Sequence, residues 1–295
     1  MFRFFINNTP FFLLKLILNF LVWIIYFIDK KHRRIIEINL KLAYNDSLNL
    51  EEKNKIIIGC YKSLVYNLAD FIKNQGITKE EILKKVSFLN EEILLKSLKE
   101  NRKIIFMTAH YGNWELLPLA IAAKFTPLTG VGRDLDSKIM NNILSKNREQ
   151  FDIQLLSKNG AMKGLIKALK SNRPVGLLVD QNTKSTEGIL IDFFGKKARH
   201  TPSIAILAKK FNAIIIPAFI QTNDYKNYVI KFLNPIESKN SENYDEDILN
   251  CVQEQAFVTE QLIREKPEEW FWFHKRWKNQ YEHLYGYKRK KSIIP

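Results

Sequence analysis

The chain has 295 residues, enough for one α/β domain with a short additional segment. It carries 46 lysines and arginines against 31 aspartates and glutamates, a formal net charge of +15. This excess indicates an anionic partner: a nucleic acid, an acidic membrane surface, or a phosphorylated or acidic-protein substrate. The two cysteines, Cys60 and Cys251, lie far apart, which argues against a disulfide framework and a structural zinc site.

The first thirty residues contain an apolar segment, residues 11–28, interrupted only by Lys15 and Asn19. As a helix it would reach roughly 27 Å, close to the thickness of a hydrocarbon core. Basic residues that follow predict a cytoplasmic location for the rest of the chain; they are Lys30, Lys31, Arg33 and Arg34. We therefore expect residues 1–34 to form a membrane anchor. The helix could also lie flat in the interface, because Lys15 and Asn19 are four residues apart and could share one polar stripe.

The remaining residues, 35–295, have the pattern of one catalytic domain that begins with a helical lead-in over 35–98. Apolar residues recur every three to four positions in the lead-in, at 36–42, 56–72 and 82–98. Short β-branched runs then predict strands at 104–108, 128–131, 175–179, 189–194, 214–219 and 228–232. Amphipathic stretches predict helices at 116–125, 137–151, 162–170, 201–211 and 245–264. This alternation predicts an α/β fold with a mostly parallel central sheet and flanking helices.

Residues 104–115, IIFMTAHYGNWE, run from a buried strand directly into a polar turn. His110 comes just after the strand, and Glu115 opens the next element. A turn through the intervening glycine and asparagine could bring the Glu115 carboxylate back to the imidazole. Such a carboxylate would fix the tautomer of the histidine and stabilise the imidazolium formed when it accepts a proton. We therefore predict that His110 is a general base with Glu115 as its partner.

No nucleophilic serine or cysteine motif accompanies the histidine, since the chain has no G-x-S-x-G and neither cysteine is nearby. This favours direct attack by a hydroxyl of the substrate. The chain also lacks a phosphate-binding loop, a complete G-x-G-x-x-G, a spaced set of metal ligands and a nucleic-acid-binding motif. The H-x4-E spacing alone is weak evidence, because it more often reflects a histidine at a strand end beside a surface glutamate.

Ordered sequence blocks distinguish these two interpretations. They are Arg33-Arg34 to Leu40, Thr108-Ala-His-x4-Glu115, Gly130-Val-Gly-Arg133, Asn147-Arg148, Asp180-Gln181 with Gly188 and Phe193-Phe-Gly195, Ile216-Pro217, and Glu268-Glu-Trp-Phe-Trp-Phe-His-Lys-Arg-Trp277. Together they resemble the lipid A late acyltransferases, the lauroyl/myristoyl transferase family, over nearly the whole chain. The family's arginine block usually reads Tyr-Arg where this chain has Gly132-Arg133. The aromatic and cationic tail, residues 270–278, fits both a membrane interface and core packing.

The resemblance implies a glycerolipid-acyltransferase-like fold at the bacterial inner membrane, with the catalytic domain in the cytoplasm. It implies that His110, oriented by Glu115, deprotonates a hydroxyl of a lipid A precursor, which attacks the thioester of an acyl-acyl carrier protein. Arg133 and Arg148 would bind the oxyanion or a phosphate, and Asp180 would bind substrate or brace Arg133. Acyl carrier protein, the glycolipid and the membrane are the implied partners. No cofactor, metal or nucleic acid is expected.

Two other functions fit parts of the sequence. An acyltransferase of the same fold could act on another glycolipid or a glycerophospholipid, although those enzymes usually show H-x4-D and a Pro-Glu-Gly-Thr-like block that this chain lacks. A non-catalytic binder of membranes or anionic ligands could account for the net charge and would not depend on His110. The sequence leaves the preferred acyl chain length open, because that length depends on the depth of the acyl-binding pocket, which the linear sequence does not show.

Overall fold

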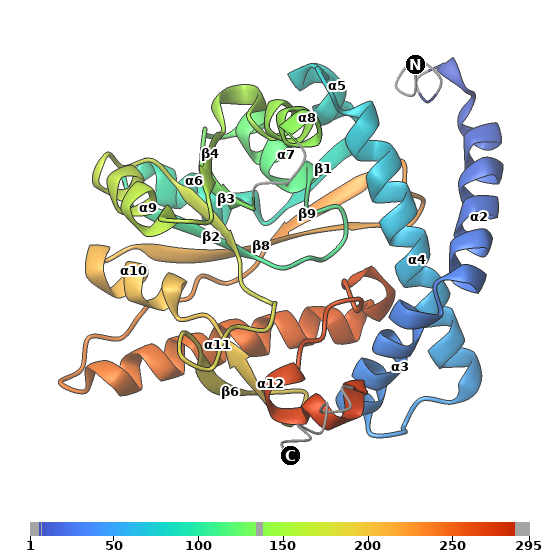
Figure 1. Ribbon diagram of the computed structural model, residues 1–295. Coiled ribbons are helices and arrows are strands. Elements are labelled where there is room, and N and C mark those ends of the chain that lie inside the picture. The colour runs from blue at the N-terminus through green and yellow to red at the C-terminus, as the bar shows by residue number, and fades with distance from the viewer. Residues whose placement is uncertain (1–5, 7, 134–137, 287–295) are drawn as a thin grey trace.

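The computed structural model describes residues 6, 8–133 and 138–286, and it is built around a seven-stranded sheet (Figure 1). The strand order is β1-β9-β8-β2-β5-β3-β4, and every neighbouring pair is parallel except β8 with β9. The strands are β1 Val86–Leu89, β2 Ile104–Thr108, β3 Thr129–Gly132, β4 Gln154–Ser157, β5 Val175–Leu178, β8 Ile214–Thr222 and β9 Tyr228–Phe232. The predicted mostly parallel α/β fold is confirmed.

Helices cover both faces of this sheet, so its central strands are apolar on both sides. These helices are α5 Lys79–Lys85, α6 Glu91–Lys99, α7 Leu116–Lys124, α8 Lys138–Arg148, α9 Ala161–Lys170, α10 Ser203–Phe211, α11 Tyr244–Glu265 and the short α12 Lys278–Tyr281. In β2, Ile104 and Phe106 face a core beneath α5, α6 and α7, whereas Ile105 and Met107 face a second core beneath α9, α10 and α11. Short 3₁₀ turns occupy η1 Gln150–Asp152, η2 Pro267–Glu269 and η3 Glu282–Tyr285.

Two departures from the predicted elements concern short strands. The continuous helix expected over 82–98 is wrong, because β1 pairs with β9 between α5 and α6. The strand expected at 189–194 is not part of the central sheet. It is β6, Ile189–Phe193, which forms an antiparallel hairpin with β7, Lys196–His200, and packs against α11. The turn between them places Gly195 at φ +66°, a conformation that glycine adopts without strain.

The apolar segment predicted at 11–28 is helix α2, Phe11–Ile28, which runs along α4, Leu50–Lys73 (Figure 1). Helix α3, Lys30–Tyr44, connects the two and begins with the Asp29 carboxylate accepting from the His32 backbone N–H. Among the described residues, α2 is the one helix long and apolar enough to cross a membrane. It is therefore consistent with the expected membrane anchor.

Residues 266–277 leave α11 and pass beneath the end of β2, in the interior of the protein. Trp270, Trp272 and Trp277 are 3%, 0% and 0% exposed, and Arg276 is 1% exposed. Of the two interpretations of this tail, core packing is therefore correct for its tryptophans. The backbone N–H of Phe271 donates to the His110 carbonyl at 2.9 Å, so the segment supports the residues that follow β2.

Candidate active site

His110 lies two residues beyond β2, at the carboxyl end of a central parallel strand, where open α/β sheets usually place their ligands. Because side chains alternate along a strand, the imidazole follows Phe106 and Thr108 on the sheet face covered by α7. The side chain is 23% exposed and lines two cavities. It is therefore accessible to ligands from the surface while its backbone is fixed.

A buried carboxylate holds the His110 ring, and it belongs to Asp180. Its Oδ1 lies 2.8 Å from His110 Nδ1, and its Oδ2 accepts a hydrogen bond from Trp270 Nε1 at 2.8 Å. Burial alone would raise the pKa of Asp180, but the His110 ring and the Trp270 donor outweigh it and hold this pKa well below its usual range. An ionised Asp180 favours the tautomer with the proton on Nδ1, which leaves Nε2 as the basic atom facing the cavities.

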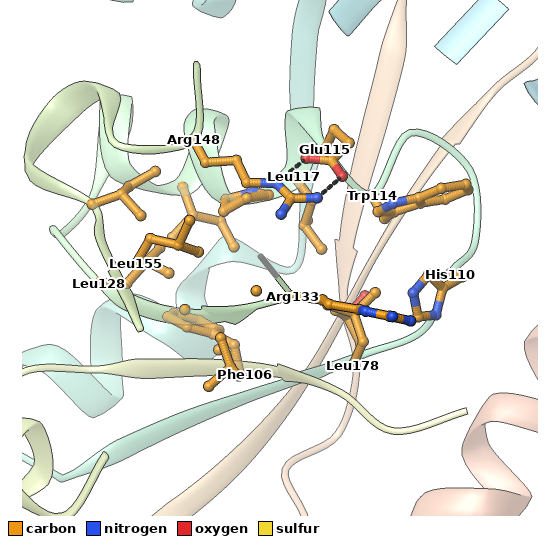
Figure 2. A pocket seen from close by; sticks show the side chains of 18 of the residues that line it. Phe106, His110, Trp114, Glu115, Leu117, Leu128, Arg133, Arg148, Leu155 and Leu178 are labelled. Carbon is orange, nitrogen blue, oxygen red and sulfur yellow. Dashed lines mark hydrogen bonds and ion pairs between the residues drawn. The ribbon is translucent and has the colours of Figure 1, made fainter. Parts of the chain in front are cut away.

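The predicted partnership of His110 with Glu115 is wrong. The Glu115 carboxylate forms a two-pronged ion pair with Arg148, with Nε–Oε2 and Nη2–Oε1 distances of 2.9 and 2.5 Å. Figure 2 shows this pair at the side of the cavity next to α7 and α8, with His110 on a separate side. The physical reason is register: Thr108 pairs with Leu178 in neighbouring strands, so residues 110 and 180, each two positions further on, emerge side by side.

The turn between His110 and Glu115 forms at the residues that the sequence predicted. Gly112 has φ +56°, and a Cβ there would lie 1.8 Å from the Ile220 carbonyl oxygen, so only glycine fits. The Gly112 N–H donates to the Glu269 carbonyl, and the Asn113 amide donates to the Asp70 carboxylate at 2.7 Å. The turn is therefore anchored both to α4 and to the C-terminal segment.

The other predicted site residues, Arg133, Arg148 and Asp180, all lie near His110 but make different contacts. Arg133, directly after β3, is exposed and lines both cavities together with His110, and Figure 2 shows its side chain extended along the cavity. Arg148 lines one of these cavities, the one that Glu115 also lines, and its guanidinium is bonded to the Glu115 carboxylate. The two Asp180 oxygens are bonded to His110 and to Trp270, and the ion pairs among the described residues do not include one between Asp180 and Arg133. Gln181, whose Nε2 lies 3.2 Å from His110 Nε2, is a further polar group at the site.

Two cavities of different character meet at His110. The first, of about 440 Å³, lies between the sheet and α7 and is lined mainly by apolar side chains. The second, of about 650 Å³, is more polar and includes Lys158 and Lys184. His110, Arg133 and Gln181 line both. This arrangement suits a reaction between an apolar ligand and an anionic one, with the histidine at their junction.

Arg276 and His200 are buried close to Asp180. Arg276 donates to the Gln181 carbonyl and to His200 Nδ1, at 3.3 and 3.2 Å. Burial lowers the pKa of Arg276 to about 10, and burial with the nearby arginine lowers the pKa of His200 to about 3. Sequence reasoning missed the roles of Trp270 and Arg276. Their presence in the C-terminal block was the available signal, but nothing in the linear sequence places that block beneath β2.

The described residues contain no group of three or more histidine, cysteine, aspartate or glutamate side chains that could hold a metal ion. The two cysteines are buried in the cores, and burial raises the pKa of the Cys60 thiol well above its ordinary value. Neither thiol lines the two cavities at His110.

Comparison with known proteins shows which family the chain resembles. The model of one family, bacterial lipid A biosynthesis acyltransferase, matches residues 1–279. The chain is 21% identical over 245 residues to lipid A biosynthesis acyltransferase 2 of Shigella flexneri, covering 83% of this chain and 77% of the relative. It is 22% identical over 255 residues to the lipid A biosynthesis lauroyltransferase of Escherichia coli K12, covering 86% and 81%. A phosphatidylinositol mannoside acyltransferase of Mycolicibacterium smegmatis is 25% identical over 128 residues, 42% of each chain.

Proposed function

The chain belongs to the bacterial lipid A biosynthesis acyltransferase family, and we propose that it transfers a fatty acyl chain from acyl-acyl carrier protein to a hydroxyl of a lipid A precursor. The observation that carries the proposal is the His110–Asp180 pair at the junction of an apolar and a cationic cavity. The acyl chain occupies the apolar cavity. The phosphorylated acceptor occupies the cavity lined by Lys158, Lys184 and Arg133.

In this mechanism His110 Nε2 takes the proton of the acceptor hydroxyl as its oxygen attacks the thioester carbonyl carbon. The tetrahedral intermediate then collapses, the C–S bond breaks, and the thiolate of the carrier takes the proton from the imidazolium. Asp180 stays ionised throughout and stabilises the positive ring. Arg133 is the described cation best placed to stabilise the oxyanion or an acceptor phosphate, because it lines both cavities beside His110.

The donor and the membrane both suit the charge of the protein. Acyl carrier protein is acidic, and a chain with a net charge of +15 attracts it and the anionic leaflet alike. We place the protein at the inner membrane with its catalytic domain in the cytoplasm, and the basic residues that follow α2 against the anionic leaflet.

The packing of α2 supports a helix that lies in the membrane interface rather than one that crosses the bilayer. One stripe of α2, Leu14, Leu18 and Val22, is buried, and Tyr66 of α4 donates to Asn19 Oδ1 at 3.0 Å. Helix α4 carries charged side chains along its length, so a spanning α2 packed in this way would draw them into hydrocarbon. The other faces of α2 expose large apolar side chains to lipid: Phe12, Leu16, Phe20, Trp23 and Phe27.

The test is acyl transfer by the purified full-length protein in detergent, with acyl-acyl carrier protein as donor and a lipid A precursor as acceptor. Wild type is expected to add one acyl chain, and His110→Ala should lower the rate by about 100- to 10,000-fold. His283→Ala, which alters an exposed histidine in η3, is the matched control and should transfer at the wild-type rate. Equal rates for wild type and His110→Ala would reject the mechanism.

A phosphatidylinositol mannoside is the second acceptor to include, because an acyltransferase for it is among the relatives of this chain. We expect the lipid A precursor to be the better acceptor, since the family match and the longer alignments all concern lipid A enzymes. Transfer to the mannoside alone would replace the acceptor in the proposal while leaving the role of His110 intact.

A further inference from the structure

A row of residues crosses the floor of the apolar cavity on three neighbouring strands. Phe106 of β2 pairs with Gly176 of β5, which in turn pairs with Gly130 of β3. Paired residues in adjacent strands point to the same sheet face, so this row lies on the face that carries Thr108 and His110. All three members line the apolar cavity. Two of the three contribute no side chain to it.

The two glycines are not required by their backbone conformations, because neither has a positive φ. A Cβ at Gly130 would meet no atom within 4 Å, and one at Gly176 would make an ordinary contact at 3.5 Å with Leu128 Cδ1. Glycine inside a strand also weakens it relative to a residue with a side chain. The consequence of glycine at these positions is therefore the space that it leaves in the cavity.

The row lies at a defined depth below His110. It is four residues back along β2, which at about 3.3 Å per residue corresponds to roughly 13 Å, about the length of ten extended methylene groups. Leu128, two residues before Gly130, is 3% exposed and forms part of the wall beyond the row. A chain whose carbonyl carbon is at His110 therefore reaches the glycines near its tenth carbon and Leu128 a few carbons later.

From this geometry we infer that Gly130 and Gly176 let acyl chains longer than about ten carbons enter the cavity, and that Leu128 limits their length. The inference rests on the proposed function, because it assigns the apolar cavity to the acyl chain. A bulky residue at position 130 shortens the chain that the protein accepts. A smaller residue at position 128 lengthens it.

The experiment compares wild type, Gly130→Leu and Leu128→Ala as full-length proteins, with carrier proteins loaded with acyl chains of eight to sixteen carbons. We expect Gly130→Leu to lower the ratio of the rates for long and eight-carbon chains by at least about tenfold, and Leu128→Ala to shift the optimum to longer chains. Leu128→Ala removes buried atoms and is expected to lower stability, but a loss of stability alone would not shift the length preference of the two variants in opposite directions. If both variants lose activity equally for every chain length, the inference is overturned.

A second measurement keeps this inference separate from the proposed function. Fatty acids of the same lengths are added to each protein without acceptor or carrier, and the rise in unfolding temperature is measured. The length that stabilises best should move down in Gly130→Leu and up in Leu128→Ala. If wild type transfers no acyl chain but this shift occurs, the proposed transfer is wrong and the cavity assignment stands. An unchanged length profile overturns the inference whatever the transfer assay shows.

Discussion

The contact between Asp180 and His110 Nδ1 leaves Nε2 of His110 facing the two cavities. The sequence identified His110 and the turn after it, because a buried strand followed by a polar, glycine-containing segment is a local pattern. It did not identify the partner of the histidine, because that depends on β2 and β5 being neighbours in register. Such adjacency follows from the crossover connections of the sheet and has no local signature. Glu115 was the near residue in sequence, and Asp180 is the near residue in space.

At this scale we predict different effects for the two carboxylates. Asp180→Asn removes the charge that stabilises the imidazolium and should lower kcat by about 100- to 10,000-fold. Glu115→Gln keeps the size of the side chain but breaks the ion pair with Arg148, and should mainly lower stability, by about 1–3 kcal/mol for a partly buried charge pair. Steady-state kinetics and urea unfolding of both variants check this. A larger loss of kcat in Glu115→Gln than in Asp180→Asn would contradict the assignment.

Among the secondary-structure elements, the sequence predicted correctly the strands that are buried on both faces. Examples are β2 and β8, whose residues are almost uniformly apolar. Three strands were missed: β1 lies within a stretch whose pattern predicted a helix, β4 is an edge strand that exposes Gln154 and Ser157, and β7 contains Lys196, Lys197 and Arg199. Charged or polar residues on short edge strands reduce aggregation, and they also remove the alternation from which strands are predicted. Helix α2 was predicted with its observed bounds, because an eighteen-residue segment that is apolar except for Lys15 and Asn19 can be recognised without tertiary context.

The orientation of α2 gives a prediction at the same scale. An Asn8→Cys variant places a thiol just before the helix, while the two natural cysteines are buried. If α2 lies in the interface, that thiol stays on the cytoplasmic side, and a membrane-impermeant thiol reagent should label it only after spheroplasts are lysed. Glu282→Cys in η3 is the control for a cytoplasmic position. Labelling of Asn8→Cys in intact spheroplasts would show that the helix crosses the bilayer.

At the scale of the whole molecule, burial of neutral histidines makes stability depend on pH. Burial lowers the pKa of His200 to about 3 and that of His274 to about 4, whereas both should titrate near 6.5 when unfolded. Between pH 6.5 and about 4 the unfolded state binds more protons, so stability falls as pH falls, by up to about 1.4 kcal/mol per pH unit for each histidine. Asp180 has a lowered pKa in the folded protein, so its contribution to stability is lost only as the pH falls below about 3.9, the pKa of an unfolded aspartate.

Urea unfolding at pH 7 and pH 5 checks this dependence, with His200→Gln as the variant that keeps an acceptor for Arg276 without ionising. The free energy of unfolding should decrease on acidification in wild type, and the decrease should be smaller in the variant. Equal pH dependence of the two proteins would mean that His200 is not held neutral.

We propose that the His110–Asp180 pair catalyses the addition of an acyl chain to lipid A. Mass spectrometry of lipid A from cells lacking this protein, rescued with wild type, His110→Ala or Asp180→Asn, tests it most directly. We expect the deficient cells to lose one secondary acyl chain, wild type to restore it, and neither variant to restore it at matched protein levels. Unchanged lipid A in the deficient cells would rule out the proposed function, and full restoration by His110→Ala would rule out the role of the histidine.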